Sequence, residues 1–341
     1  MCVVAGYIGE RQAAPLLLEM LEREEGLGGG FYTGIATIHE GRLYTEKVVG
    51  DVAALRRQTD AEKLPGTIGI AHSRTPSGGD REWAHPFVDC TGQLAYIANG
   101  ARGFFSETTN LAEAGRQLAA AGHKFRSICQ EPVGNYPMVP EVGAVHMSDV
   151  MCHLIEEAYR KSGSLVAAAA EAYQGWPGEI VGMCLHVNEP DHVVAMRINQ
   201  PLVIGREGGE TYLATTSLAF PEPVSWRMPM AVNAAATVSR ESVEIRHFTS
   251  ARVPVAPMPS PLAVEQTVVN ALREEGLLGI GALCGRTKPI WPDGALGQDA
   301  MLVYETVAAL VAEGRVRLET DLVPGMFGEG QVPRTRVRWI A

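Results

Sequence analysis

Short segments in which apolar residues run together or alternate with polar ones dominate the first hundred residues, and this period of two predicts β-strands. A second group of such segments appears after residue 178. The predicted strands are 3–8, 32–39, 43–49, 67–72, 93–98, 179–187, 192–198, 202–205, 211–215, 231–239 and 243–248.

Apolar residues at spacings of three and four predict helices between these two groups and beside the first. The predicted helices are 10–25, 51–63, 109–121, 150–160 and 164–173. Strands, then helices, then strands again is an order typical of packed layers, with antiparallel sheets and segregated helices.

A proline-rich segment at 251–261 interrupts the pattern and predicts a linker. It divides a large domain, 2–250, from a small one, 262–341. In the small domain the pattern predicts helices at 262–274, 277–284 and 300–313, then two strands at 315–320 and 332–340. Three helices followed by a hairpin resemble a winged-helix module.

Composition narrows the classes of partner. The 341 residues carry a formal net charge of −10, which argues against nonspecific binding to nucleic acid or anionic membranes. No apolar run reaches ~18 residues and no signal-type segment opens the chain, so we expect a cytoplasmic protein without a membrane span. Whether it forms a homo-oligomer stays open.

The winged module is an improbable reader of DNA, because its third helix, 300–313, contains neither arginine nor lysine. Arg334, Arg336 and Arg338 alternate on one strand face. A solvated sheet face or a protein interface explains them better than contacts with phosphates.

The six cysteines are scattered along the chain and form no CxxC pair. Free thiols are therefore expected rather than a disulfide framework. Cys152 and His153 are adjacent, and neighbours on a helix point about 100° apart, so they are unsuited to act as joint ligands. We predict no metal site and no cofactor.

Cys2 is the first candidate for chemistry. If Met1 is removed, one residue carries both a thiol and an α-amine, and an α-amine titrates near pH ~7.7–8.0. Such an amine can act as the general base for the adjacent nucleophile. The alternative is a buried structural cysteine at the start of an apolar strand.

Three further segments favour the catalytic interpretation of Cys2 over the structural one. They are 69–74 (GIAHSR), Ala84-His85-Pro86 and 97–100 (IANG). Together with Cys2 they resemble the glutaminase domain of class II glutamine amidotransferases, and most closely that of glucosamine-phosphate synthases. The resemblance extends to 201–205 (PLVIG) and 212–216 (YLATT), so it covers about residues 2–250. It implies the four-layer αββα fold of N-terminal-nucleophile hydrolases.

The resemblance also implies roles for residues. Cys2 would attack the side-chain amide of glutamine, and Asn99 with the N–H of Gly100 would stabilise the oxyanion. Arg74 would bind the α-carboxylate of the substrate. The alternatives are a hairpin turn at Asn99-Gly100 and a solvated loop arginine.

Other substrate contacts lie in the loop after Arg74. Thr75 and Ser77 stand where the family has a longer, tryptophan-containing loop, and Ser77 offers a hydroxyl. His85 would lie near the mouth of the site, or would simply stack in the loop before Pro86.

The chain also departs from the family pattern. Val3 replaces a glycine, and Met147 occupies the position of the acid that binds the α-amino group of glutamine. Asp149, two residues on, could replace that acid if the loop shifts. The sugar-isomerase domains of the synthases do not follow, so ammonia would pass to a separate synthase protein. The alternative is an impaired glutaminase fold that acts as an amino-acid sensor or interaction module.

Overall fold

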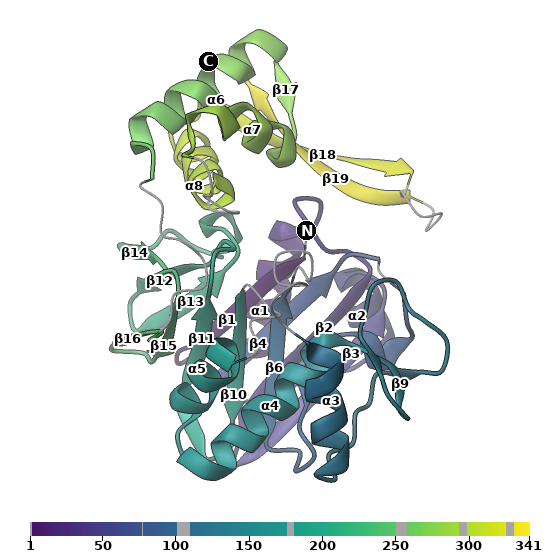
Figure 1. The fold of residues 1–341 in the computed structure, drawn as a ribbon. Helices are drawn as coiled ribbons and strands as arrows, with labels where there is room; N and C mark the ends of the chain where they lie inside the picture. The colour runs from purple at the N-terminus through teal and green to yellow at the C-terminus, as the bar shows by residue number, and fades with distance from the viewer. Residues whose placement is uncertain are drawn as a thin grey trace.

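The computed structural model describes residues 2–76, 78–100, 110–175, 181–249, 258–292, 299–324 and 331–341. Two antiparallel sheets face one another in the N-terminal region, and a smaller helical domain with a long hairpin lies against one end of it (Figure 1). Within the described residues, no helix is both long enough and apolar enough to cross a membrane.

The first sheet has the strand order β14-β12-β13-β1-β4-β2-β3, and every neighbouring pair is antiparallel. Strand β1 therefore lies at its centre. The strands are β1 (Val3–Ile8), β2 (Tyr32–His39), β3 (Arg42–Val49), β4 (Ile68–Arg74), β12 (Val203–Glu207), β13 (Glu210–Ala214) and β14 (Trp226–Pro229).

The second sheet has the order β16-β15-β11-β10-β6-β5 and is also antiparallel. Its strands are β5 (Phe87–Val88), β6 (Leu94–Asn99), β10 (Val181–His186), β11 (Glu189–Arg197), β15 (Ala234–Val238) and β16 (Val243–His247). Fully buried side chains from both sheets, such as Val4 and Ile97, fill the space between them.

Strand β1 explains why its sequence is apolar at every position. Val3, Ala5 and Tyr7 pack toward helix α1, whereas Val4 and Ile8 pack toward the second sheet. A strand with both faces covered has no solvent face that calls for polar residues.

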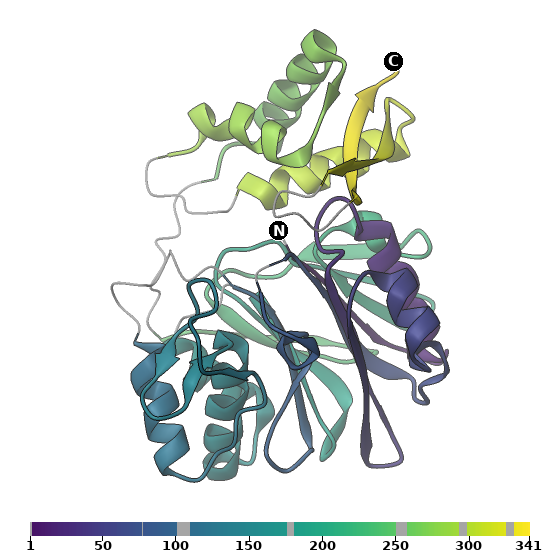
Figure 2. The same cartoon turned by 90° about the vertical axis from the view of Figure 1, so that its right-hand side faces the viewer.

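Helices cover the outer face of each sheet. Helices α1 (Ala13–Glu24) and α2 (Val52–Gln58) pack on the first sheet, and α3 (Leu111–Ala120), α4 (Met147–Ser162) and α5 (Leu165–Gly175) form the layer on the second (Figures 1 and 2). The order helix, sheet, sheet, helix agrees with the predicted layers. Helix α4 starts three residues earlier than predicted, because the His146 side chain accepts a hydrogen bond from the Ser148 N–H and caps it.

Short elements were missed by the sequence pattern. A small sheet is made of β7 (Ile128–Cys129), β8 (Met138–Val139) and β9 (Gly143–Val145). Strands of two or three residues are too short to show an alternating pattern. Single 3₁₀ turns lie at Ala61–Lys63, Arg81–Trp83, Ser217–Ala219 and Lys288–Ile290.

The described part of the C-terminal domain contains the predicted helices and hairpin. Its elements are α6 (Pro261–Glu275), β17 (Leu277–Leu278), α7 (Ile280–Thr287), α8 (Asp299–Ala312), β18 (Val316–Pro324) and β19 (Gln331–Trp339). The predicted helix at 277–284 instead opens with strand β17, whose Leu277 and Leu278 pair with β19. Assignment of this arrangement to the winged-helix class stays a prediction.

The hairpin and helix α8 of the C-terminal domain contact the N-terminal region. The Thr335 N–H of the hairpin donates to the Gly26 carbonyl at 2.8 Å. Met301 of α8 packs into the core beneath α1, and the Ser217 hydroxyl donates to Glu305 at 2.9 Å. The hairpin thus lies over the glycine-rich loop that follows α1 (Figure 1).

Candidate active site

The start of β1 and the end of β6 meet where the two sheets come together. The Asn99 side-chain amide donates from Nδ2 to the Cys2 carbonyl oxygen at 3.0 Å. The half-buried Cys2 Sγ lies 3.8 Å from Thr75 Oγ1. The fold therefore brings together Cys2, Thr75 and Asn99, which are far apart in the sequence and were each expected at one site.

His72 fixes the orientation of the Asn99 amide. Its Nε2 lies 2.9 Å from the Ala98 carbonyl and 3.2 Å from Asn99 Oδ1, and both of these atoms are acceptors. Nε2 therefore carries the hydrogen, and the NH₂ group of Asn99 is turned toward Cys2. Burial and the nearby Arg74 cation lower the pKa of His72 to about 3, so the ring is neutral.

No role was predicted for His72, although a signal was present. His72 and Arg74 are two residues apart on β4, so both side chains leave the same face of the strand. Once Arg74 was a candidate, that spacing pointed to His72 as its neighbour in the site.

Arg74 is buried among neutral groups. Its guanidinium donates to the Tyr136 hydroxyl at 3.0 Å and to the Gly78 carbonyl at 2.8 Å, and it stacks 3.9 Å from the centre of the Tyr32 ring. In the part of the chain that the structure describes, no carboxylate forms an ion pair with it, and its Nε has no acceptor. Because a buried charge without an opposite charge beside it is costly, this group is suited to receive an anion.

His85 lies in the wall behind the site and not at its mouth. It is 1% exposed, and its ring stacks on His72 with 3.9 Å between centroids. His146 lies 5.2 Å away, edge to face. Burial, followed by the neighbouring His72, His146, Arg74 and Lys47, holds the pKa of His85 well below its usual range.

Asp149 is not placed to replace the missing acid. It is fully buried on α4, and its Oδ2 accepts hydrogen bonds from the N–H groups of Arg126 and Ser127 at 2.9 Å. Its Oδ1 lies 3.3 Å from His153 Nδ1. Met147 belongs to the apolar core beside α4. The predicted shift of the loop, which would turn Asp149 toward the substrate, is therefore absent from this structure.

Gly100 and Ser77 are the other two residues predicted at the site. Gly100 is exposed directly after β6. Ser77 lies outside the described residues.

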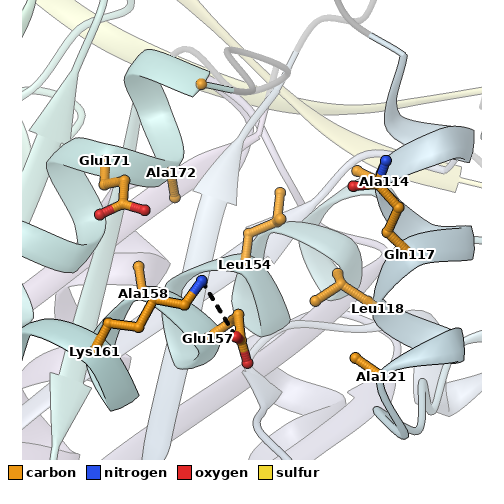
Figure 3. A pocket seen from close by; sticks show the side chains of 11 residues that line it. Ala114, Gln117, Leu118, Ala121, Leu154, Glu157, Ala158, Lys161, Glu171 and Ala172 are labelled. Carbon is orange, nitrogen blue, oxygen red and sulfur yellow. Dashed lines mark ion pairs between the residues drawn. The ribbon is translucent and has the colours of Figure 1, made fainter.

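Two cavities of about 360 Å³ lie on the surface. One, between α3, α4 and α5, has Leu118, Leu154 and Ala158 in its wall and the Glu157–Lys161 ion pair at its rim (Figure 3). None of the predicted site residues lines it. The other is lined by Tyr32 and Pro76 on one side and by Gln331, Val332 and Pro333 of the hairpin on the other. Because Tyr32 stacks on Arg74, this second cavity adjoins the site.

One group of residues with metal-binding side chains was not foreseen. Cys90, His123, His153 and Glu156 each place a ligand atom within 4.8 Å of the others. They come from three separate segments, so the sequence spacing rules that predicted no metal site had no pattern to find.

The comparisons with known proteins point to one family. No protein-family model matches the chain. The isomerizing glutamine–fructose-6-phosphate aminotransferase of Pyrococcus horikoshii is 32% identical over 222 residues, which are 64% of this chain and 33% of that protein. The enzyme of the same name from Symbiobacterium thermophilum is 34% identical over 220 residues, 63% of this chain and 31% of its own. The chain thus spans about a third of the length of these relatives.

Solved structures agree in fold. Glutamine phosphoribosylpyrophosphate amidotransferase from B. subtilis superposes with a TM-score of 0.59 at 16% identity, covering 96% of this chain and 68% of its own. At that identity the likeness concerns the fold alone. The resemblance drawn from the strand motifs is confirmed: the N-terminal region of this chain is similar to part of the isomerizing glutamine–fructose-6-phosphate aminotransferases, and it shares its fold with a glutamine amidotransferase.

Proposed function

We propose that the N-terminal domain hydrolyses the side-chain amide of glutamine through a thioester on Cys2. The observation that carries this proposal is the Asn99 amide, which His72 orients and which lies 3.0 Å from the Cys2 carbonyl. A donor held in place beside a nucleophile is what an oxyanion needs, because no reorganisation is then required as charge develops.

Cys2 would act in two steps, formation of the thioester and its hydrolysis. After removal of Met1, the α-amine accepts the proton of the thiol, and the thiolate adds to the amide carbon. The amide oxygen becomes an oxyanion near Asn99 Nδ2 and the Gly100 N–H. Collapse breaks the carbon–nitrogen bond and releases ammonia, with the proton returned by the α-amine. Water then hydrolyses the thioester to glutamate and free Cys2.

The neutral histidines do not serve as the base. The hydrogen of His72 Nε2 is held by two acceptors, and burial and Arg74 lower the pKa of this ring to about 3. That leaves the α-amine, whose pKa of ~7.7–8.0 in an ordinary setting suits proton transfer near neutral pH.

Arg74 would bind the substrate α-carboxylate, since it is a buried cation with only neutral partners in the described structure. The α-ammonium group has no matching acid, because Met147 lies in the core and Asp149 faces inward. We therefore expect glutaramate, which is glutamine without its α-amino group, to be hydrolysed about as well as glutamine.

The ammonia released would pass to a separate synthase protein, which would use it. The similarity to the aminotransferases covers residues from the N-terminal region, and the C-terminal hairpin covers the loop beside the site. The second cavity, between Tyr32 and Pro333, is where we expect substrate to enter.

The test uses the full chain. Mass spectrometry first establishes that Met1 is removed, and then ammonia and glutamate are measured with glutamine as substrate. Turnover should depend on Cys2, so Cys2→Ala should abolish it, whereas the matched control Cys129→Ser should keep it. Equal turnover in the Cys2→Ala variant would refute the thioester.

A second candidate is a catalytically impaired domain that senses an amino acid. The missing acid at Met147 favours it. Calorimetry separates the two candidates: binding of glutamine by the processed protein, without release of ammonia, supports the sensor.

A further inference from the structure

Four side chains with metal-binding chemistry converge beside α4, on residues that the proposed glutaminase reaction does not use. His153 and Glu156 lie three residues apart on α4, so they share one face of the helix. Cys90 belongs to the turn between β5 and β6, and His123 to the turn after α3. The four ligand atoms lie within 4.8 Å of one another.

His153 has a buried ring nitrogen with nothing to bind. Its side chain is fully buried, and its Nδ1 lies 2.8 Å from the Asp149 carbonyl oxygen and 3.3 Å from Asp149 Oδ1. Burial opposes the charge of the ring, but the Asp149 carboxylate at Nδ1 raises the pKa of His153 to about 9, so a metal ion bound at Nε2 would take the place of a proton. That Nε2 is buried and has no hydrogen-bond partner in the described residues, which calls for a ligand.

His123 is held in the complementary way. Its Nδ1 lies 3.9 Å from Cys90 Sγ and 3.1 Å from Glu156 Oε2. Its other nitrogen, Nε2, lies 3.4 Å from Glu157. Each histidine therefore has a carboxylate on the nitrogen that faces away from the cluster. Carboxylates in that position orient histidine ligands of metals and fix their tautomer.

Backbone groups prepare the other two ligands. The Lys124 N–H donates to Cys90 Sγ at 3.3 Å, which holds the sulfur in place. The Cys90 N–H donates to Glu156 Oε2, also at 3.3 Å, while the other oxygen of Glu156 pairs with Arg160. The ligand atoms are thus positioned by contacts that do not require them to move.

We propose that Cys90, His123, His153 and Glu156 bind a divalent transition metal, for which zinc is the best match. One thiolate and one carboxylate balance the charge of Zn²⁺, and Cys, His and carboxylate ligands are those zinc prefers. Ligand bonds of about 2.0–2.3 Å in a tetrahedron place ligand atoms about 3.3–3.6 Å apart. The separations of 3.1 and 3.9 Å around His123 Nδ1 are close to that.

The site would be structural. Four protein ligands leave no open position on a tetrahedral ion, and binding releases protons from the Cys90 thiol and from His153 Nε2. The ion would join α4 to the β5–β6 turn and to the turn after α3. Since Asp149 holds both His153 and the N–H groups of Arg126 and Ser127, the loop after His123 is joined to the same centre.

The experiment uses the full, tag-free chain stripped of metal with a chelator. Zinc is titrated against a chromophoric competitor, and cobalt(II) is used as a spectroscopic probe. We expect one zinc per chain and a thiolate-to-cobalt charge-transfer band. Cys90→Ser should weaken zinc binding at least about tenfold and remove the band. Cys129→Ser, at a half-buried thiol outside the cluster, should change neither.

Two further variants keep the test decisive. Glu156→Gln keeps the shape of the ligand and should also weaken binding, and circular dichroism establishes that it is folded. Cys2→Ser should bind zinc as the wild type does, which separates this site from the proposed active site and leaves the result independent of glutaminase activity. Absence of zinc from the wild type, a cobalt complex without the thiolate band, or loss of binding in Cys2→Ser would each overturn the proposal.

Discussion

At the sheet junction Asn99 links Cys2 to a histidine, whereas beside α4 Cys90 contacts a histidine directly, and the partners of the histidines differ. At the sheet junction, His72 donates to the Ala98 carbonyl and to the amide of Asn99, and the nearby charge is the Arg74 cation. Beside α4, both His123 and His153 are held by carboxylates. Similar residue types therefore lie in opposite electrostatic surroundings.

The difference indicates which ligand each place receives. A guanidinium with neutral partners favours an anion, and a donor amide beside a thiol favours a developing oxyanion. Imidazoles backed by carboxylates, with a thiol and a third carboxylate, favour a cation. Each site contains a cysteine, so the cysteine does not distinguish them. The charges around the histidines do.

The largest effect should come from removing the oxyanion donor. Asn99→Ala should lower kcat for glutamine by about 10²–10³ and leave KM nearly unchanged, because the donor acts mainly in the transition state. Steady-state ammonia release measures both constants. Asn188→Ala, in an exposed turn, is the matched control. If Asn99→Ala lost zinc binding as well, the two places would not be separate.

Arg74→Gln tests the anion side of the comparison. Charge-assisted hydrogen bonds contribute about 1.5–3 kcal/mol, so KM for glutamine should rise about 10- to 100-fold. Arg81→Gln, in the following loop and exposed, should leave KM unchanged. A fall in kcat with KM intact would assign Arg74 to the transition state instead of to the substrate carboxylate.

Asp149→Asn tests the cation side. The amide oxygen of Asn still accepts from the Ser127 N–H, but its NH₂ group would then face His153 Nδ1. The histidine would have to move its proton to Nε2, the nitrogen proposed to bind metal. Zinc affinity should therefore fall about 10- to 100-fold. Competition with a chromophoric chelator measures it, and an unchanged affinity would argue against His153 as a ligand.

The fold could be predicted largely from the sequence because long strands and helices carry a periodic pattern. Strand β1 is apolar throughout and α1 repeats at helical spacing, and both appear as expected. The hydrophobic pattern did not predict short elements such as β7 to β9. It also did not predict the first residues of α4, because the side chain of His146 caps that helix and periodicity does not mark its start.

The site could be predicted where local motifs carry it and not where long-range contacts do. Asn99 and Arg74 could be found because they follow recognisable strands. The burial of His85 and the inward turn of Asp149 depend on packing between elements distant in sequence. Cys90 and His123 are 33 residues apart and meet only in three dimensions. Rules based on sequence spacing cannot predict such a contact.

The smallest effect concerns the histidine behind the active site and is read from stability against pH. Both ring nitrogens of His85 are buried without hydrogen-bond partners in the described structure, so His85→Phe removes polar atoms that bind nothing. Replacing such a group by an apolar ring of similar shape should be nearly neutral at pH 7.5.

At lower pH the variant should become the more stable protein. The pKa of His85 is held well below 6.5, first by burial and then by His72, His146, Arg74 and Lys47. As pH falls below 6.5, the unfolded chain therefore takes up a proton that the folded chain does not, and each such histidine lowers the free energy of unfolding by about 1.4 kcal/mol per pH unit. His85→Phe removes one of these protons, so the free energy of unfolding should depend less steeply on pH.

Urea unfolding between pH 7.5 and 5 should show this smaller slope, whereas His39→Asn, at an exposed histidine, should keep the slope of the wild type. An unchanged slope in His85→Phe would mean that His85 is protonated in the folded protein, and the neutral surroundings proposed for the active site would then be wrong.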